Sequence, residues 1–247
     1  MQITTTAIAF LSLAAGLWIC GFWFLKVWRR SENKTPTNKK ISLLLTLLFA
    51  NFGLQNAIMG GGAALFPGNP EALYWSLAIS HFFLITAALI AVYTSYYIFS
   101  PHLSPLFPMI LAGVVGVAMH IGTILDHPLP YITPAGGIEW NMSYWLSVLV
   151  FLTLFISIGG NFYIFWNLFR RAKTKEVRNL AFILALAAFL GVVNVFIRLV
   201  ILENESVRTR LFDLLLATIG IIFIGALLIW PLARRWLREV FKIKTAD

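Results

Sequence analysis

The stretch L-Y-W-S-L-A-I-S-H-F-F-L-I-T-A-A-L-I-A-V-Y-T-S-Y-Y-I-F, residues 73–99, contains no Asp, Glu, Lys or Arg. An uncharged apolar run longer than about 18 residues is typical of a helix that crosses a membrane. Several other segments have the same character. Of the 247 residues, 60% are hydrophobic and 12% are charged, and the mean hydropathy is +0.83. Soluble domains are about 45–50% apolar and about 25% charged, so the sequence predicts an integral membrane protein.

Polar and Pro-rich segments divide the chain into seven predicted spans. Pro and Gly stand where the apolar runs end, as in P-G-N-P-E at 67–71, and these residues are common at helix ends. We expect an all-α integral membrane protein: a single seven-transmembrane helix bundle over residues 1–232, followed by a basic amphipathic cytoplasmic tail at 233–247. The predicted spans lie near residues 5–28, 42–66, 73–99, 107–125, 144–169, 180–202 and 211–232.

Lys and Arg indicate the orientation of these spans. Six occur in residues 26–40, five in 170–178 and five after residue 233, whereas 126–143 has none and 203–210 has two. Basic residues are enriched in cytoplasmic loops. We therefore expect the N-terminus outside and the C-terminus inside. The net charge of +9 reflects this orientation, so the lipid bilayer is the expected partner and nucleic acid is not.

A charged residue stands inside the sixth span, in N-V-F-I-R-L-V-I-L-E at 194–203. A charge at the centre of a bilayer costs about 2.5–3.5 kcal/mol on insertion scales, so it needs a partner. Arg198 and Asp213 lie about one turn from the same end of consecutive spans. One interpretation is therefore a purely structural Arg198–Asp213 ion pair.

The other interpretation is a polar pocket open to the outer side, with Arg198 as the anchor for an anion. Its planar guanidinium binds carboxylate or phosphate through two parallel hydrogen bonds. Polar residues of several helices favour the same leaflet. They can instead be helix–helix contacts, worth about 0.6 kcal/mol each, and a lone His on an apolar helix is more often a packing residue. The predicted ligand-binding residues are Arg198, His81, His120, Gln55, Asn194 and Asp213.

Consecutive glycines mark the end of the second span, in M-G-G-G-A-A-L-F-P-G at 59–68. Glycine permits close helix approach but weakens a helix. Either another helix packs tightly there or the span unwinds to line a cavity. We favour close packing, and we interpret Gly159 and Gly160 in the same way.

Motifs of known catalytic chemistry are missing from the sequence. It has no H-E-x-x-H, G-x-S-x-G, C-x-x-C or Gly-rich phosphate loop. We therefore expect no enzyme activity, no catalytic or metal-binding residues and no cofactor. Haem held by His81 and His120 is an alternative, since two histidines on two helices can ligate the iron.

Four segments carry a resemblance to a known family: E-A-L-Y-W-S-L at 71–77, A-G-G-I-E-W at 135–140, the basic loop at 170–179, and R-L-F-D-L-L-L-A at 210–217. In these segments the chain resembles the seven-transmembrane sensor region of bacterial histidine kinases. The resemblance implies ligand or membrane-state sensing with a signal passed inward, and a multi-pass protein of the bacterial inner (plasma) membrane. The kinase itself is not present in this sequence, so either the protein signals through a partner or it is not a sensor.

We therefore predict a receptor-like sensor. It would bind a small ligand from the outer side, anionic if Arg198 anchors it, and signal to a cytoplasmic or membrane protein partner. Two other functions use the same polar residues. One is a small-solute transporter or channel, and the other is a structural membrane subunit in which those residues hold the helices together.

Overall fold

The computed structural model describes residues 4–29, 36–99, 102–172, 175–200 and 205–228. Within these residues the fold is all-α, as predicted, apart from one two-stranded antiparallel hairpin. The elements are α1 (Thr5–Arg29), α2 (Pro36–Leu65), α3 (Pro70–Phe99), α4 (Leu106–Asp126), β1 (Tyr131–Ile132), β2 (Ile138–Glu139), α5 (Tyr144–Arg171), α6 (Lys175–Val200) and α7 (Glu205–Leu228).

Five of the described helices are long and apolar enough to cross a membrane: α1 to α5. In α6 the apolar stretch is shorter, Ala181–Ile197. Several helices extend beyond the predicted apolar spans. For example, α7 begins at Glu205, six residues before the predicted start. The predicted amphipathic tail at 233–247 lies outside the described residues.

The start of α3 illustrates how the local sequence fixes a helix end. Asn69 is the N-cap, and its side-chain Oδ1 accepts a hydrogen bond of 3.1 Å from the backbone N–H of Ala72. Pro70 follows at the first helical position, where its missing N–H costs nothing. Glu71 then places a negative charge near the positive end of the helix dipole.

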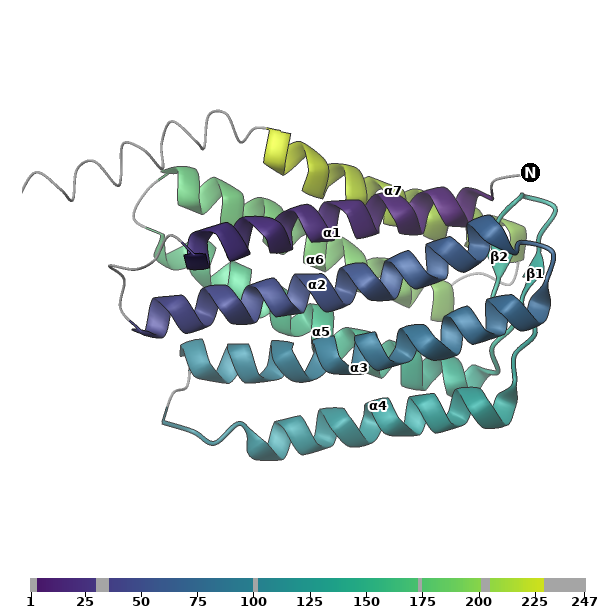
Figure 1. The fold of residues 1–247 in the computed structure, drawn as a ribbon, viewed down its shortest axis with the longest axis horizontal. Helices are drawn as coiled ribbons and strands as arrows, with labels where there is room; N and C mark the ends of the chain where they lie inside the picture. The colour runs from purple at the N-terminus through teal and green to yellow at the C-terminus, as the bar shows by residue number, and fades with distance from the viewer. Residues whose placement is uncertain (1–3, 30–35, 100–101, 173–174, 201–204, 229–247) are drawn as a thin grey trace, which may run out of the picture.

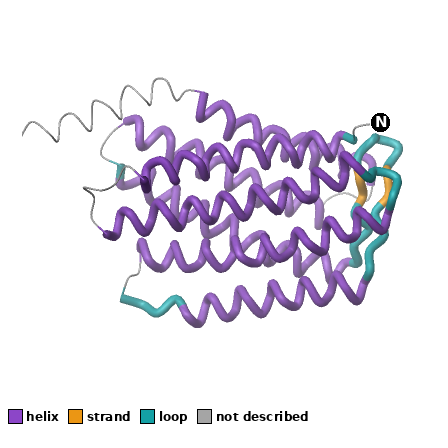
Figure 2. The backbone as a smooth tube through the Cα atoms, in the orientation of Figure 1, coloured by secondary structure: helices purple, strands orange, loops and turns teal. Residues whose placement is uncertain are grey.

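The helices lie side by side along the long axis of the molecule (Figure 1). Six of them form a closed ring in the order α1, α2, α3, α5, α6, α7, so that the first and last helices are neighbours. Helix α4 lies outside this ring and packs mainly against α3 and α5. The hairpin and its flanking loops cover the end of the bundle at which α1 begins (Figure 2). We call this end of the bundle the hairpin end.

Small residues allow the closest helix contacts. A Cβ on Gly220 of α7 would lie 2.8 Å from the backbone N of Leu13 on α1. In α2, a Cβ on Gly60 would lie 3.0 Å from the backbone N of Leu11, and one on Gly62 would clash with Ser76 of α3. Since α2 stays helical to Leu65, the prediction of close packing is confirmed at Gly60 and Gly62, whereas a Cβ on Gly61 would meet nothing within 4 Å. The prediction is wrong at Gly159, where an added Cβ would meet nothing within 4 Å.

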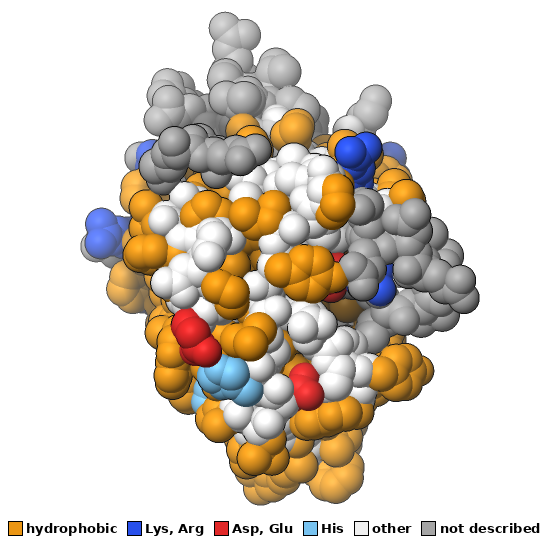
Figure 3. All heavy atoms as spheres, turned by 90° about the vertical axis from the view of Figure 1, so that its right-hand side faces the viewer, with side chains coloured by type: hydrophobic (Ala, Val, Ile, Leu, Met, Phe, Trp, Pro, Cys, Tyr) orange, Lys and Arg blue, Asp and Glu red, His pale blue; other side chains and the backbone are white. Residues whose placement is uncertain are grey.

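The outward surface suits a hydrocarbon environment. On α4, large apolar side chains such as Phe107 (77% exposed), Val114 (60%) and Leu125 (76%) point away from the ring. Viewed at the hairpin end, hydrophobic groups surround a mostly uncharged centre that carries a few acidic and histidine side chains (Figure 3). One exposed pair there joins His127 Nε2 to Glu71 Oε1 at 3.1 Å.

Candidate ligand-binding site

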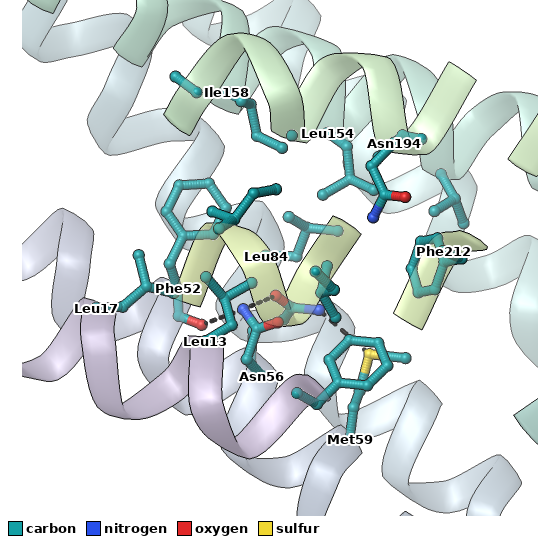
Figure 4. A pocket seen from close by; sticks show the side chains of 18 of the residues that line it. Leu13, Leu17, Phe52, Asn56, Met59, Leu84, Leu154, Ile158, Asn194 and Phe212 are labelled. Atoms are coloured by element: carbon teal, nitrogen blue, oxygen red, sulfur yellow. Dashed lines mark hydrogen bonds between the residues drawn. The ribbon is translucent and has the colours of Figure 1, made fainter. Parts of the chain in front are cut away.

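A cavity of about 210 Å³ lies inside the ring of six helices. Every helix except α4 contributes to its wall, and residues from β2 to Met142 close it at the hairpin end. Figure 4 shows side chains from these elements converging on one space. Most of the wall is apolar, as in most small-molecule sites. The polar residues of the wall are Gln55, Asn56, His81, Glu139, Ser147, Asn161, Asn194 and Arg208.

Three helices place amides and an imidazole at a similar depth in this cavity. Asn194 is six residues from the hairpin end of α6, Gln55 is ten from that end of α2, and His81 is eleven from that end of α3. At 1.5 Å per residue, Gln55 and His81 lie roughly 15 to 17 Å below their helix ends, and Asn194 lies roughly 9 Å below Val200, the last described residue of α6. We call Gln55, Asn56, His81 and Asn194 the polar belt.

The two α2 residues of the belt bond to each other. Asn56 Nδ2 donates to Gln55 Oε1 at 2.8 Å and to the backbone oxygen of Phe52 at 2.7 Å. Gln55 Nε2 contacts the Sδ of Met59 at 3.2 Å (Figure 4). A thioether is a weak acceptor, so the Gln55 amide retains donor capacity toward the cavity.

Asn194 of α6 differs from Gln55 and Asn56 in its hydrogen bonding. Its side chain is fully buried (0% exposed), and among the described residues neither Nδ2 nor Oδ1 has a hydrogen-bond partner. Figure 4 shows its amide pointing into the cavity. Leaving a buried polar group unpaired costs about 1–3 kcal/mol. The amide therefore offers a donor and an acceptor to whatever occupies the cavity.

The tautomer of His81 follows from its neighbour on α4. Thr123 Oγ1 lies 3.0 Å from the backbone oxygen of Met119 and 3.1 Å from His81 Nδ1. A hydroxyl has one proton. When Thr123 donates this proton to the backbone oxygen of Met119, the Thr123 oxygen can only accept a hydrogen bond from His81. Nδ1 then carries the ring hydrogen, and Nε2 is left as an acceptor.

Below the belt the cavity ends in aromatic and aliphatic side chains. Phe49 is the centre of this floor. Its ring lies 6.3 Å from that of Phe165 and 6.1 Å from that of Phe223, and it stacks on Phe24 at 5.7 Å. The floor therefore separates the polar belt from the far end of the bundle mainly by hydrocarbon. Asn161 is the polar wall residue at this depth, and its Nδ2 donates to the backbone oxygen of Ser157 at 3.1 Å.

At the hairpin end, the cavity is closed by the segment from Ile138 to Met142, which we call the roof. Trp140 is fully buried and meets the ring of Phe10 edge to face, with centroids 6.3 Å apart. Its indole Nε1 has no partner among the described residues. Trp140 therefore brings a buried, unsatisfied indole donor to the roof.

Glu139 fixes the roof to α7. Its Oε2 lies 3.2 Å from Arg208 Nη2 and accepts a hydrogen bond of 3.1 Å from Thr209 Oγ1. The carboxylate is 9% exposed and the guanidinium 23%. Because the two charges are paired, this part of the wall presents little net charge to a ligand.

Asp213 fixes the start of α1 to α7 beside the roof. Its Oδ2 accepts hydrogen bonds from Thr5 Oγ1 at 2.7 Å and Thr6 Oγ1 at 2.8 Å. Thr6 Oγ1 in turn accepts 2.8 Å from the backbone N–H of Ile138. The adjacent Gly137 has no room for a side chain, since a Cβ would lie 2.9 Å from Asp213 Oδ2.

The structure brings three of the six predicted ligand-binding residues, Gln55, His81 and Asn194, into one cavity wall. Asp213 is not in this wall and holds the roof. His120 lies close to His81, with ring centroids 6.4 Å apart, but packs on Phe82 at 4.3 Å and does not line the cavity.

Arg198 is in the last turn of α6. Its side chain lies outside the part of the chain that the structure describes, and so does the predicted Arg198–Asp213 pair.

The haem alternative does not fit the two histidines. His81 bonds to Thr123 of α4 and His120 stacks on Phe82 of α3, so the two helices are in direct contact at both rings. That contact leaves no room for a macrocycle between them. Among the described residues, no three His, Cys, Asp or Glu side chains come close enough to hold a metal ion.

Glu139, Trp140 and Arg208 were missed in the sequence analysis. All three stand in or beside loops, where no periodicity indicates the direction of a side chain. The one signal is a Glu-Trp pair in the long loop at 126–143, which has no basic residue of its own.

Comparisons with protein-family models, with curated proteins and with solved structures gave no match to this chain.

Proposed function

We propose that the chain is a receptor-like membrane sensor that binds a small ligand in the central cavity. The observation that carries this proposal is the amide of Asn194, fully buried, directed into the cavity and unpaired among the described residues. A structural subunit gains nothing from such a group, because an apolar residue there would be more stable. A binding site does gain, because the amide's hydrogen bonds are made only when a ligand is present.

The shape of the cavity favours a receptor over a transporter. A transporter has to open its site alternately to both sides, commonly through broken helices at the bilayer midplane. Here the helices that line the cavity are continuous over their described lengths, and the floor around Phe49 is a packed aromatic cluster. A ligand that enters through the roof would have to leave by the same route, as expected for a receptor.

In the proposal all seven helices span the membrane, with the hairpin end outside. Basic side chains support this orientation, since Arg29, Lys40 and Arg171 lie at the end of the bundle opposite the hairpin. The resemblance to histidine-kinase sensor regions adds the bacterial plasma membrane as the location. The signal would then pass to a cytoplasmic or membrane protein partner.

Reconstitution into liposomes tests the proposal against its two alternatives. We expect small-molecule probes to raise the melting temperature of the wild type but not of Asn194→Leu, with no flux of the same probes across the bilayer. Flux that depends on Asn194 would favour a transporter. A chain that neither binds nor transports, and whose Asn194→Leu variant differs only in stability, would be a structural subunit.

A further inference from the structure

We propose that the cavity takes a neutral amphiphile, a molecule with one uncharged polar head and a hydrocarbon body of roughly eight carbons. This inference rests on the proposed function and names its ligand class. It is carried by two environments that follow one another along the cavity. The polar belt lies toward the roof, and below it lies the mainly aromatic floor, where Asn161 is the polar side chain and its N–H is bonded to Ser157.

The polar belt is suited to an uncharged head group that both donates and accepts hydrogen bonds. Asn194 presents an unpaired amide, so it can bond to a carbonyl and to an N–H or O–H of the same head group. On the facing helices, Gln55 retains donor capacity and His81 Nε2 is an acceptor. A primary amide or a hydroxyl satisfies such a set, and a hydrocarbon does not.

The charges of the wall argue against an ionised head. Among the described side chains that line the cavity, Glu139 and Arg208 are the acidic and basic ones, and they neutralise each other at 3.2 Å. A carboxylate or ammonium moved to the belt would leave water without a counter-charge, which is strongly unfavourable. The neutral form of the same head avoids this cost.

The size of the cavity sets the length of the body. An apolar cavity of about 150 Å³ is known to hold benzene, and this one measures about 210 Å³. From Gln55 to Phe49 the wall of α2 covers about 9 Å, all of it below the belt. A molecule of about ten non-hydrogen atoms, head included, fits these dimensions.

Octanamide and octanoate form a matched pair of probes, because they have the same chain and the same number of non-hydrogen atoms and differ in charge. We would measure melting temperatures in lipid nanodiscs at pH 7.5, where octanoate is ionised, with octylammonium as the cationic probe. The variants are wild type, Asn194→Leu and Asn51→Leu. Asn51 is the matched control, because this amide of α2 bonds to the backbone oxygen of Leu47 at 2.8 Å and does not line the cavity.

We expect octanamide at saturation to raise the melting temperature of wild type and Asn51→Leu by roughly 5 °C, and octanoate and octylammonium to have no such effect. In Asn194→Leu the affinity for octanamide should fall roughly tenfold or more.

Two results would overturn the neutral class while leaving a ligand-binding cavity. One is a larger shift with octanoate that Arg198→Gln abolishes, which would make the ligand anionic. The other is a shift with octylammonium that Asn194→Leu abolishes. If no probe of any charge shifts the melting temperature of wild type differently from that of Asn194→Leu, the result contradicts both the neutral ligand and the proposed function.

Discussion

Thr6 and Asp213 are separated by 207 positions in the chain and joined by a hydrogen bond of 2.8 Å. The same Thr6 hydroxyl accepts a bond from the backbone N–H of Ile138. One side chain therefore ties α1, α7 and the roof together at the hairpin end. Because a hydroxyl has one proton and two acceptor sites, no hydrocarbon side chain of the same shape can replace it.

We expect Thr6→Val to lower the free energy of unfolding by about 1–3 kcal/mol, since hydrogen bonds to charged groups are worth about that much. The roof should also become more accessible, which hydrogen exchange of residues 127–143 would report. Thr86→Val is the control, because Thr86 is a residue of α3 whose hydroxyl bonds only to the backbone oxygen of Phe82. Equal loss of stability in the two variants would contradict the role given to Thr6.

Asn194→Leu should have the opposite effect on stability. Replacing an unpaired buried amide with hydrocarbon removes a penalty of about 1–3 kcal/mol, so the ligand-free variant should unfold at a higher denaturant concentration than wild type. The same variant should lose ligand binding. A less stable Asn194→Leu would mean that this amide is paired in the protein under native conditions.

Glu139 and Arg208 should show strong coupling in a double-mutant cycle. Either Glu139→Gln or Arg208→Gln removes the ion pair and leaves the other charge in a largely buried site. Each should cost about 1–3 kcal/mol, less than the roughly 3–5 kcal/mol of a fully buried pair, because the guanidinium is 23% exposed. The double variant should recover part of the sum of the single losses, because neither charge then remains. Strictly additive losses, measured by unfolding in mixed micelles, would show that the two side chains do not act as a pair.

Gly220→Ala should destabilise the α1–α7 contact by about 1–3 kcal/mol, because the added methyl would meet the backbone of Leu13 and Ser12. Backbone atoms in a packed helix cannot move aside as a flexible side chain can. Gly225→Ala, also in α7, is the control: its Cβ would meet nothing within 4 Å, so it should be neutral or slightly stabilising. The melting temperatures of the two variants in one detergent check this difference.

Single cysteines at the two ends of the bundle test the proposed orientation. Gly68 lies in the exposed loop between α2 and α3, and Leu103 (54% exposed) lies just before α4 at the other end. In intact cells a membrane-impermeant maleimide should label Gly68→Cys, and it should label Leu103→Cys only after permeabilisation. The native Cys20 is buried and serves as the background. The reverse pattern would place the hairpin end in the cytoplasm.

The positions of the helices could be predicted from the sequence because uncharged runs and Pro-rich breaks are local features. Helix α7 extends beyond the predicted apolar span at its start, because the polar residues from Glu205 to Arg210 resemble a loop in the sequence. In the structure they are helical, and Glu139 of the distant roof binds two of them, Arg208 and Thr209. No local pattern reveals such a long-range partner.

The sequence indicates how deep the candidate site residues lie in the bundle, but not which of their side chains face the cavity. Counting residues from the helix ends placed Gln55, His81, His120 and Asn194 near one level, and three of these four line the cavity. His120 does not line the cavity, because α4 lies outside the ring of six helices. The sequence contains no signal for that position of α4. The helices that are long and apolar enough to cross a membrane have apolar residues on every side, so hydrophobic periodicity does not distinguish the face toward the bundle interior from the outward face.

The contact between α1 and α7 has a consequence for biosynthesis. The wall of the cavity is complete only when the first helix of the ring meets the last one, and α7 leaves the ribosome after the other six. Until then, Asn194 and the rest of the polar belt belong to an open ring, whose gap faces lipid if all seven helices span the membrane as proposed. If all seven helices span the membrane as proposed, the packing of α7 against α1, with Asp213 accepting hydrogen bonds from Thr5 and Thr6, is the step that closes the ring around the cavity.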